Sequence, residues 1–160
     1  MRDAISPQQT SKNPLTPHWI AVAIMLLLLA GYVIGCLTIT KEPSFAIPET
    51  ERIWMRTVCY VLAILLFPLT NLIRHIQLRL NQTMPGDKSA KRRYLLTVVV
   101  SMALIHSVGL MGVAMFLVGD DVNTLYILVG MAALGAFLYR PKWDEYLSIV
   151  EALDHLTINP

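Results

Sequence analysis

Four long apolar runs dominate this chain, and its charged residues are gathered in the short intervals between them. A helix needs about 20 mostly apolar residues to cross the core of a bilayer, which is roughly 30 Å thick. Runs close to this length occupy residues 19–39, 54–73, 94–118 and 122–139. The sequence therefore predicts an all-α membrane protein in which four antiparallel helices cross a bilayer.

The composition favours the same class, because 55% of the 160 residues are hydrophobic and only 15% are charged. A soluble domain normally carries about a quarter charged residues. The intervals are too short for a separate soluble domain. We expect three parts, a disordered polar tail at 1–17, a transmembrane domain at 18–141 and a helix at 142–160. No basic surface interleaved with aromatic residues indicates nucleic-acid binding.

The fourth run has the weakest signal of the four. It has 18 residues, and Asn123, Thr124 and Gly135 are among them. The alternative is a hydrophobic helix that packs under the others without crossing fully. A half-buried helix would leave backbone groups without partners in lipid, so we favour a full crossing. The third run has 25 residues and can tilt to fit the bilayer.

The distribution of Lys and Arg predicts the orientation, because these residues concentrate on the cytoplasmic side of a membrane. One side of the bundle is expected to hold three of them, Lys41, Arg52 and Arg56. The other side is expected to hold ten, namely Arg2, Lys12, Arg74, Arg79, Lys88, Lys91, Arg92, Arg93, Arg140 and Lys142. We therefore predict that both termini and the interval 75–93 are cytoplasmic, in a cell (inner) membrane.

The first run ends in a pattern that has a second reading. The residues Val-Ile-Gly-Cys at 33–36 resemble a lipoprotein processing box, and the chain carries a basic residue, Arg2, near its start. Cys36 would then be lipidated. However, the apolar character continues through Leu37 and Ile39. We therefore expect the first run to be a permanent anchor.

The segment 142–160 is predicted to be a cytoplasmic amphipathic helix. Its apolar residues recur at spacings of three and four, which places them on one face, at Trp143, Leu147, Val150, Leu153 and Leu156. The opposite face is acidic, whereas helices that bind anionic lipid carry Lys and Arg there. We therefore expect this helix to dock on protein, either on its own bundle, where the basic stretch 88–93 is the candidate contact, or on a partner.

His106 lies almost midway along the third run, where an ionisable side chain is costly and marks a functional candidate. It can be a proton relay, a haem ligand, a metal ligand or a neutral residue bonded to a neighbouring helix. The last of these is the most ordinary role. Haem with two axial ligands is disfavoured, because His75 is expected at one end of the second run, roughly 18 Å away along the bundle axis.

The two cysteines, Cys36 and Cys59, are expected at similar depth near the outer ends of the first two runs. A disulfide is possible if these helices touch. A soft copper(I) site with nearby methionines is another possibility. Methionines in apolar helices are ordinarily packing residues, so we favour two separate buried thiols.

Polar residues near the ends of the runs are candidates for contacts between helices. Arg56 is expected on the same side as Asp120 and Asp121, so an ion pair can lock these ends together. Arg56 can equally extend to the membrane surface. On the other side, we match Thr70 and Asn71 in depth with the polar residues of the third run, Thr97 and Ser101.

Small residues four positions apart suggest where helices approach closely. Gly31 and Gly35 form such a pair in the first run, and Ala132 and Ala136 form a weaker one in the fourth. These pairs can serve packing within the chain or contact with a second molecule.

No pattern for catalysis, metal binding or cofactor binding is present in the sequence. There is no phosphate-binding glycine loop, no His-Glu-x-x-His and no pair of carboxylates within a run. We therefore predict no catalytic residues, no metal and no cofactor. The favoured hypothesis is a non-enzymatic accessory or assembly subunit that binds a membrane-protein partner or a second copy of itself. The alternative is a small oligomeric transporter or channel that uses His106 and the outer acidic residues.

Overall fold

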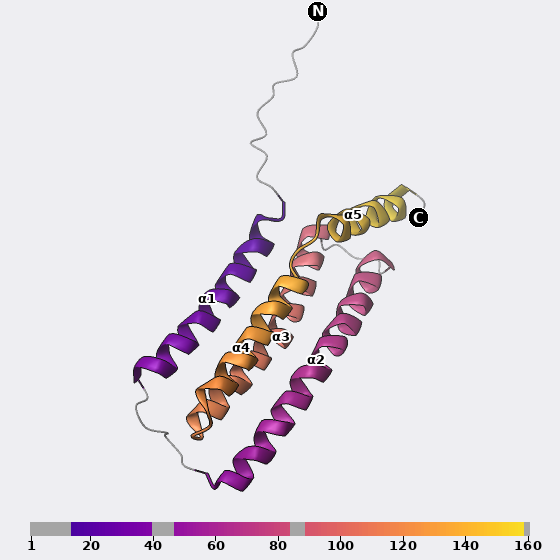
Figure 1. The fold of residues 1–160 in the computed structure, drawn as a ribbon. Coiled ribbons are helices and arrows are strands. Elements are labelled where there is room, and N and C mark those ends of the chain that lie inside the picture. The colour runs from indigo at the N-terminus through magenta and orange to yellow at the C-terminus, as the bar shows by residue number, and fades with distance from the viewer. Residues whose placement is uncertain (1–13, 40–46, 84–88, 159–160) are drawn as a thin grey trace, which may run out of the picture.

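The computed structural model describes residues 14–39, 47–83 and 89–158, and this part of the chain is all helical, as predicted. Residues 1–13 of the predicted polar tail and residues 40–46 of the interval after the first run lie outside the described residues. The last two residues of the predicted tail, Thr16 and Pro17, are instead the start of the first helix. Figure 1 shows five helices, which are α1 (Thr16–Ile39), α2 (Glu49–Thr83), α3 (Ala90–Leu117), α4 (Val122–Leu138) and α5 (Trp143–Ile158).

The helices follow the apolar runs, and three of them extend beyond the ends of those runs. The largest extension is in α2, which has 35 residues and continues through Pro68 as far as Thr83. The sequence Met-Pro-Gly follows directly, and residues of these types end helices. At 1.5 Å per residue, α2 is about 52 Å long and exceeds the thickness of a bilayer core.

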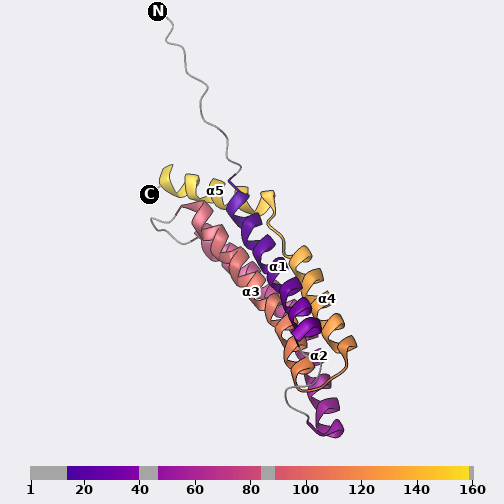
Figure 2. The ribbon, with the colours of Figure 1, turned by 90° about the vertical axis from the view of Figure 1, so that its left-hand side faces the viewer.

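The third helix lies at the centre of the bundle. Half of its most apolar stretch is buried, compared with 17% for α1 and 11% for α2. Helices α1, α2 and α4 all contact α3, and α1 also contacts α4. Figure 2 shows α1 beside α3 and α4, with α5 across one end. Within the described ranges, α1 and α2 do not contact one another, so one side of α3 stays open between them.

Glycines allow α3 and α4 to approach closely. A Cβ atom on Gly112 would lie 3.0 Å from the Leu128 Cβ and 3.3 Å from the Leu125 carbonyl oxygen. A Cβ atom on Gly135 would lie 2.5 Å from the Ile105 Cγ2. Small residues at such positions bring two helix backbones together and increase their van der Waals contact, which is the main source of helix association in lipid.

The helix α5 turns away from α4 and lies across one end of the bundle (Figure 1). The two helices are bent by 46° at the break between them. Ile149 is fully buried, and Tyr146 and Leu153 pack against the core from the same face of α5. The side chains of Trp143 and Glu151 remain exposed. One face of this helix therefore covers the end of the bundle.

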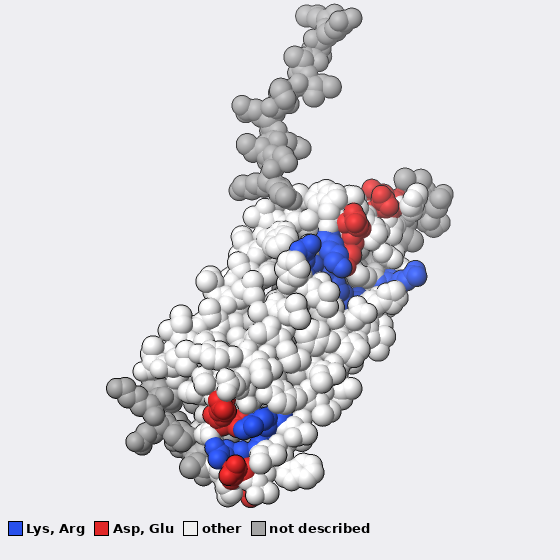
Figure 3. Space-filling view, in the orientation of Figure 1, with Lys and Arg blue, Asp and Glu red and all other residues white. Residues whose placement is uncertain are grey.

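Three helices, α1, α2 and α3, are long and apolar enough to cross a membrane, and α4 with α5 makes a fourth if this bent pair is counted as one span. Figure 3 shows the charged residues on one face of the molecule gathered near its two ends, with an uncharged belt between them. On α2 the belt runs from Arg56 to Arg74, which are 18 positions or about 27 Å apart. This distance is close to the thickness of a bilayer core.

Candidate functional site

The end of the bundle near α5 holds a network that we call the elbow cluster, made of Arg74, Tyr94, Tyr139, Lys142 and Glu145. The Arg74 guanidinium donates to the Glu145 carboxylate at 2.6 Å and to the Tyr139 carbonyl oxygen at 2.8 Å. The Tyr94 hydroxyl donates to Glu145 at 2.9 Å and accepts from the Lys142 backbone N–H at 2.7 Å. This network joins α2 and α3 to the bend between α4 and α5.

The ion pair at the centre of this network is largely removed from solvent. The side chain of Arg74 is 5% exposed and that of Glu145 is 20% exposed. Arg74 also donates to the Arg140 carbonyl oxygen at 3.3 Å. Buried charges need partners of this kind, because an unpaired charge in a site of low dielectric constant is costly. The pair therefore fixes the position at which the chain leaves α4.

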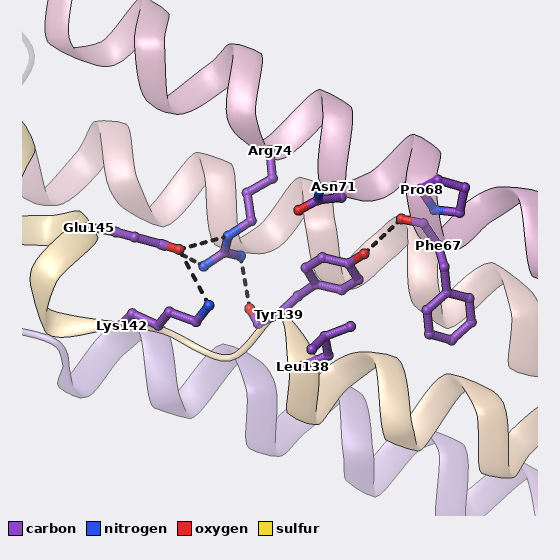
Figure 4. Close-up of a pocket in the computed structure, with 8 residues that line it drawn as sticks. All are labelled: Phe67, Pro68, Asn71, Arg74, Leu138, Tyr139, Lys142 and Glu145. Atoms are coloured by element: carbon purple, nitrogen blue, oxygen red, sulfur yellow. Dashed lines mark hydrogen bonds and ion pairs between the residues drawn. The ribbon is translucent and has the colours of Figure 1, made fainter.

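Beside the elbow cluster, a pocket of about 360 Å³ opens between α2 and the α4–α5 bend. Figure 4 shows its lining residues, which are Phe67, Pro68, Asn71, Arg74, Leu138, Tyr139, Lys142 and Glu145. The Tyr139 hydroxyl donates to the Phe67 carbonyl oxygen at 2.7 Å across this pocket. The polar residues lie toward α5 and the apolar ones lie toward the middle of the bundle.

Sequence reasoning missed the elbow cluster. Arg74 is visible in the sequence as the first cation after the second run, and Glu145 as an acidic residue in the first turn of the last helix. However, 71 positions separate them, and no spacing rule predicts that they meet. The expected contact between the last helix and the basic stretch 88–93 falls partly on residues outside the described ranges.

An aromatic group adjoins the elbow cluster where α1 begins. The His18 ring is fully buried, with its centroid 5.0 Å from that of Tyr94 and 6.5 Å from that of Tyr146. Trp143 lies 5.7 Å from Tyr146 on the outer side. Aromatic rings stabilise each other at these separations. The group therefore packs the start of α1 against α3 and α5.

At the opposite end, the tight turn between α3 and α4 positions Asp120. Gly119 has a φ of 87°, and the Gly119 and Asp120 N–H groups donate to the Phe116 and Met115 carbonyl oxygens, which is a Schellman motif. Glycine adopts this left-handed conformation without the strain that a Cβ would cause. Asp121 then caps α4 by accepting from the Asn123 N–H at 2.9 Å. The carboxylates of Asp120 and Asp121 therefore have different roles.

Arg56 forms an ion pair with Asp120, and Arg52 donates to the Gly119 carbonyl oxygen. Burial by itself would raise the pKa of Asp120, but hydrogen bonds from Arg56, the Thr124 side chain and the Asp121 backbone together lower it below its ordinary value. Asp120 is therefore ionised at neutral pH. The structure brings together Arg56 and Asp120, two of the three predicted outer residues, while Asp121 acts as a helix cap.

The structure corrects the expected contact of Thr70 and Asn71 with Thr97 and Ser101. Thr97 instead accepts from the Asn81 side chain at 2.9 Å, while Ser101 donates to the Thr97 carbonyl oxygen of its own helix. Thr70 is buried, and its hydroxyl has no hydrogen bond to a described residue. The expectation was wrong because α2 is longer than its apolar run and continues beside the start of α3. The true match to Thr97 lies about ten positions further along α2 than we expected.

His106 is packed inside the bundle, on the side of α3 that faces α1. It is 9% exposed, and its ring centroid lies 5.5 Å from that of Tyr32. Its Nδ1 atom makes no hydrogen bond within the described ranges, and His106 does not line the pocket beside the elbow cluster. In the same part of the chain, no group of three His, Cys, Asp or Glu residues could hold a metal ion.

The structure does not bring the two cysteines together. Neither cysteine is in a disulfide; Cys36 is buried on α1 and Cys59 is half-buried on α2. Since the described parts of α1 and α2 do not touch, a bond between these thiols would require the helices to rearrange. The condition on which a disulfide was considered, contact between the first two helices, is therefore not met.

The two pairs of small residues lie in different surroundings. Ala132 and Ala136 are buried in the core. Gly31 and Gly35 lie on α1, and a Cβ atom on either would meet nothing within 4 Å. Ala132 lies opposite Gly109 at the α3–α4 contact, and this contact also uses two glycines outside the predicted pairs, Gly112 and Gly135. Their sequence signal is only that small residues are frequent in both runs.

The residues predicted for partner docking on α5 are divided between two environments. Leu153 packs against the core of the bundle, Leu147 and Val150 are half-buried, and Trp143 is 45% exposed. The face that contacts the bundle is centred on Ile149. Docking of a partner on the rest of this surface stays a prediction.

The fold and its polar ends thus define an all-helical protein with three helices, or four with the bent pair, that are long and apolar enough to cross a membrane. Comparisons with protein-family models, with curated proteins and with solved structures found no match to this chain.

Proposed function

We propose that this chain is a multi-pass protein of a cell (inner) membrane that crosses it four times in antiparallel directions, with both termini and α5 on the cytoplasmic side. The support for the fourth crossing is the length of α4, whose 17 residues extend about 25 Å between Asp121 and Arg140. The uncharged belt on α2 has nearly the same height. The cations near α5, among them Arg79 and Arg93, favour this end as cytoplasmic.

Chemical labelling of introduced cysteines tests this topology. In a variant with both native cysteines replaced by alanine, we expect a membrane-impermeant maleimide to label Glu51→Cys and Asn123→Cys in intact cells. Glu151→Cys should be labelled only after the membrane is opened. All three positions are exposed, so failure to react reports the membrane and not burial. Equal labelling of Asn123→Cys and Glu151→Cys in intact cells would show that α4 does not cross.

As to its role, we propose that the protein is a non-enzymatic accessory or assembly subunit that binds another membrane protein or a second copy of itself. The observation that carries this proposal is the open α3 stripe, formed by Leu96, Ala103, Leu110 and Leu117. All four residues are exposed, on the side of α3 turned away from α4. They recur every seven residues, which is the repeat of a helix–helix seam.

The polar residues considered for transport are engaged elsewhere, which favours the binding role. His106 packs against Tyr32, and Asp120 is paired with Arg56. A path for ions or protons needs such groups to face water, whereas a packed histidine and a paired carboxylate serve the architecture of the bundle.

Co-purification in a mild detergent tests the binding role. We expect the wild-type chain to elute with a second polypeptide, or a second copy, at fixed stoichiometry. Ala103→Trp should leave it a lone monomer, because the indole would protrude from the open α3 stripe and prevent close contact with a second helix. Ala30→Trp is the matched control, since Ala30 is also exposed but lies on α1. A wild-type monomer, or an Ala103→Trp variant that retains its partner, would contradict the proposal.

A further inference from the structure

The pocket beside the elbow cluster has the polarity gradient of a lipid. Its inner end is apolar, formed by Phe67, Pro68 and Leu138. Its other end, nearest α5, is polar and carries Arg74, Lys142 and Glu145 (Figure 4). The gradient follows the axis of the bundle, because the polar end is toward α5 and the apolar end is toward the charge-free belt. Its volume of about 360 Å³ falls in the range of small-ligand sites.

The charge of this pocket favours an anion. Arg74 and Glu145 neutralise each other in their ion pair. Lys142 forms a longer ion pair with the same carboxylate, with its Nζ 4.0 Å from a Glu145 oxygen and its side chain 53% exposed. The exposed amide of Asn71 lies on the same rim. The lining therefore carries one net positive charge and an amide donor, and these are the groups that hold a phosphate oxygen.

The position of the pocket favours a phospholipid over free phosphate as its ligand. Arg74 lies at the end of the uncharged belt, so the polar end of the pocket would be at the level of lipid headgroups if the proposed membrane topology holds. Beyond the pocket, exposed apolar residues continue toward the middle of the belt, with Ile64 one turn before Phe67 and Pro68 on α2 and Leu134 one turn before Leu138 on α4. A free phosphate would use only the polar end, whereas a phospholipid would use both ends.

We propose that this pocket binds one anionic phospholipid, with its phosphate at Lys142 and Asn71 and an acyl chain along the apolar wall of Pro68 and Leu138. This inference rests on the proposed membrane topology. The bound lipid would fill the space between α2 and the α4–α5 bend and would support the elbow cluster from its membrane side.

Native mass spectrometry of the delipidated full-length chain in detergent tests the proposal. Phosphatidylglycerol, added back in steps, should bind at one site more tightly than phosphatidylcholine. Lys142→Ala should weaken this binding about tenfold, because a charge-assisted hydrogen bond is lost. Lys91→Ala, an exposed lysine outside the pocket, should leave it unchanged. The Lys142 contacts to Tyr94 use backbone atoms, so the alanine variant retains them.

Blocking the apolar wall provides a second variant that leaves every charge in place. Leu138→Trp should abolish the single tight site by filling the pocket. Phe137→Trp should not, because Phe137 is exposed on the same helix and does not line the pocket. Equal affinity in Leu138→Trp and Phe137→Trp, or in Lys142→Ala and Lys91→Ala, would overturn the proposal.

Two further measurements show whether a negative result concerns the lipid ligand or the proposed topology. If millimolar inorganic phosphate displaces phosphatidylglycerol completely, the ligand is free phosphate and the lipid assignment is wrong. Retention of the lipid under the same conditions supports it. Binding in detergent does not depend on the orientation of the protein in a membrane. If cysteine labelling is as expected but the chain has no tight lipid site, this inference is overturned and the proposed topology stands. Tight binding with reversed labelling would overturn only the proposed topology.

Discussion

Replacing Arg74 with alanine is expected to lower the free energy of unfolding by about 3 kcal/mol, the lower end of the range for removing one partner of a buried ion pair. The loss is large because Glu145 and the Tyr139 carbonyl oxygen would both lose a charged donor. Glu145 retains some exposure to solvent, which places the effect at the lower end. Equilibrium unfolding in mixed micelles, followed by circular dichroism, measures the change.

Arg79→Ala is the matched control for this experiment, because Arg79 is an exposed arginine on the same helix. It should change the free energy of unfolding by less than about 0.5 kcal/mol. Glu145→Gln and the double variant complete a cycle, in which we expect the two sites to be coupled by at least about 1 kcal/mol. Additive effects would mean that Arg74 and Glu145 do not form a pair in the folded protein.

Replacing Gly112 with leucine is expected to cost about 3 kcal/mol or more by forcing α3 and α4 apart. The contacts that a side chain would meet include the Leu125 carbonyl oxygen and the Leu128 Cβ, neither of which is the flexible end of a side chain. The helices must therefore move, and the close packing of the core around Gly112 would be lost. The same unfolding measurement gives the effect.

Gly130→Leu is the control for a glycine in an apolar helix. Gly130 lies on α4, and a Cβ atom there would meet nothing within 4 Å. Leucine is also the better helix former, so Gly130→Leu should leave stability unchanged or raise it slightly. Similar losses from Gly112→Leu and Gly130→Leu would show that packing between α3 and α4 is not what Gly112 provides.

Much of the local structure could be predicted from the sequence. Apolar runs of sufficient length indicate helices, and the Met-Pro-Gly sequence after Thr83 indicates where α2 ends. The candidate pairing of Arg56 with Asp120 could also be predicted, because both residues lie next to the ends of their runs. The length of a run limits the depth of its end residues, and short turns bring such ends together.

The register between helices could not be predicted from the sequence. Thr70 and Asn71 were matched with Thr97, but Asn81 occupies that place. An apolar run shows only the part of a helix that suits lipid. The polar continuation of α2 beyond Ile73 carries no period strong enough to show how it packs against α3.

Length, hydropathy and charge act locally along the chain, so the all-helical class and the division into apolar helices with charged ends follow from the sequence alone. Which residues meet depends on how the helices pack. This packing places α3 at the centre and separates Cys36 from Cys59, because α1 and α2 pack on different sides of α3. It also joins Arg74 to Glu145 across 71 positions. Such pairs depend on the close approach of backbones at glycines such as Gly112 and on the bend after α4, which are properties of the packed bundle and not of any single segment.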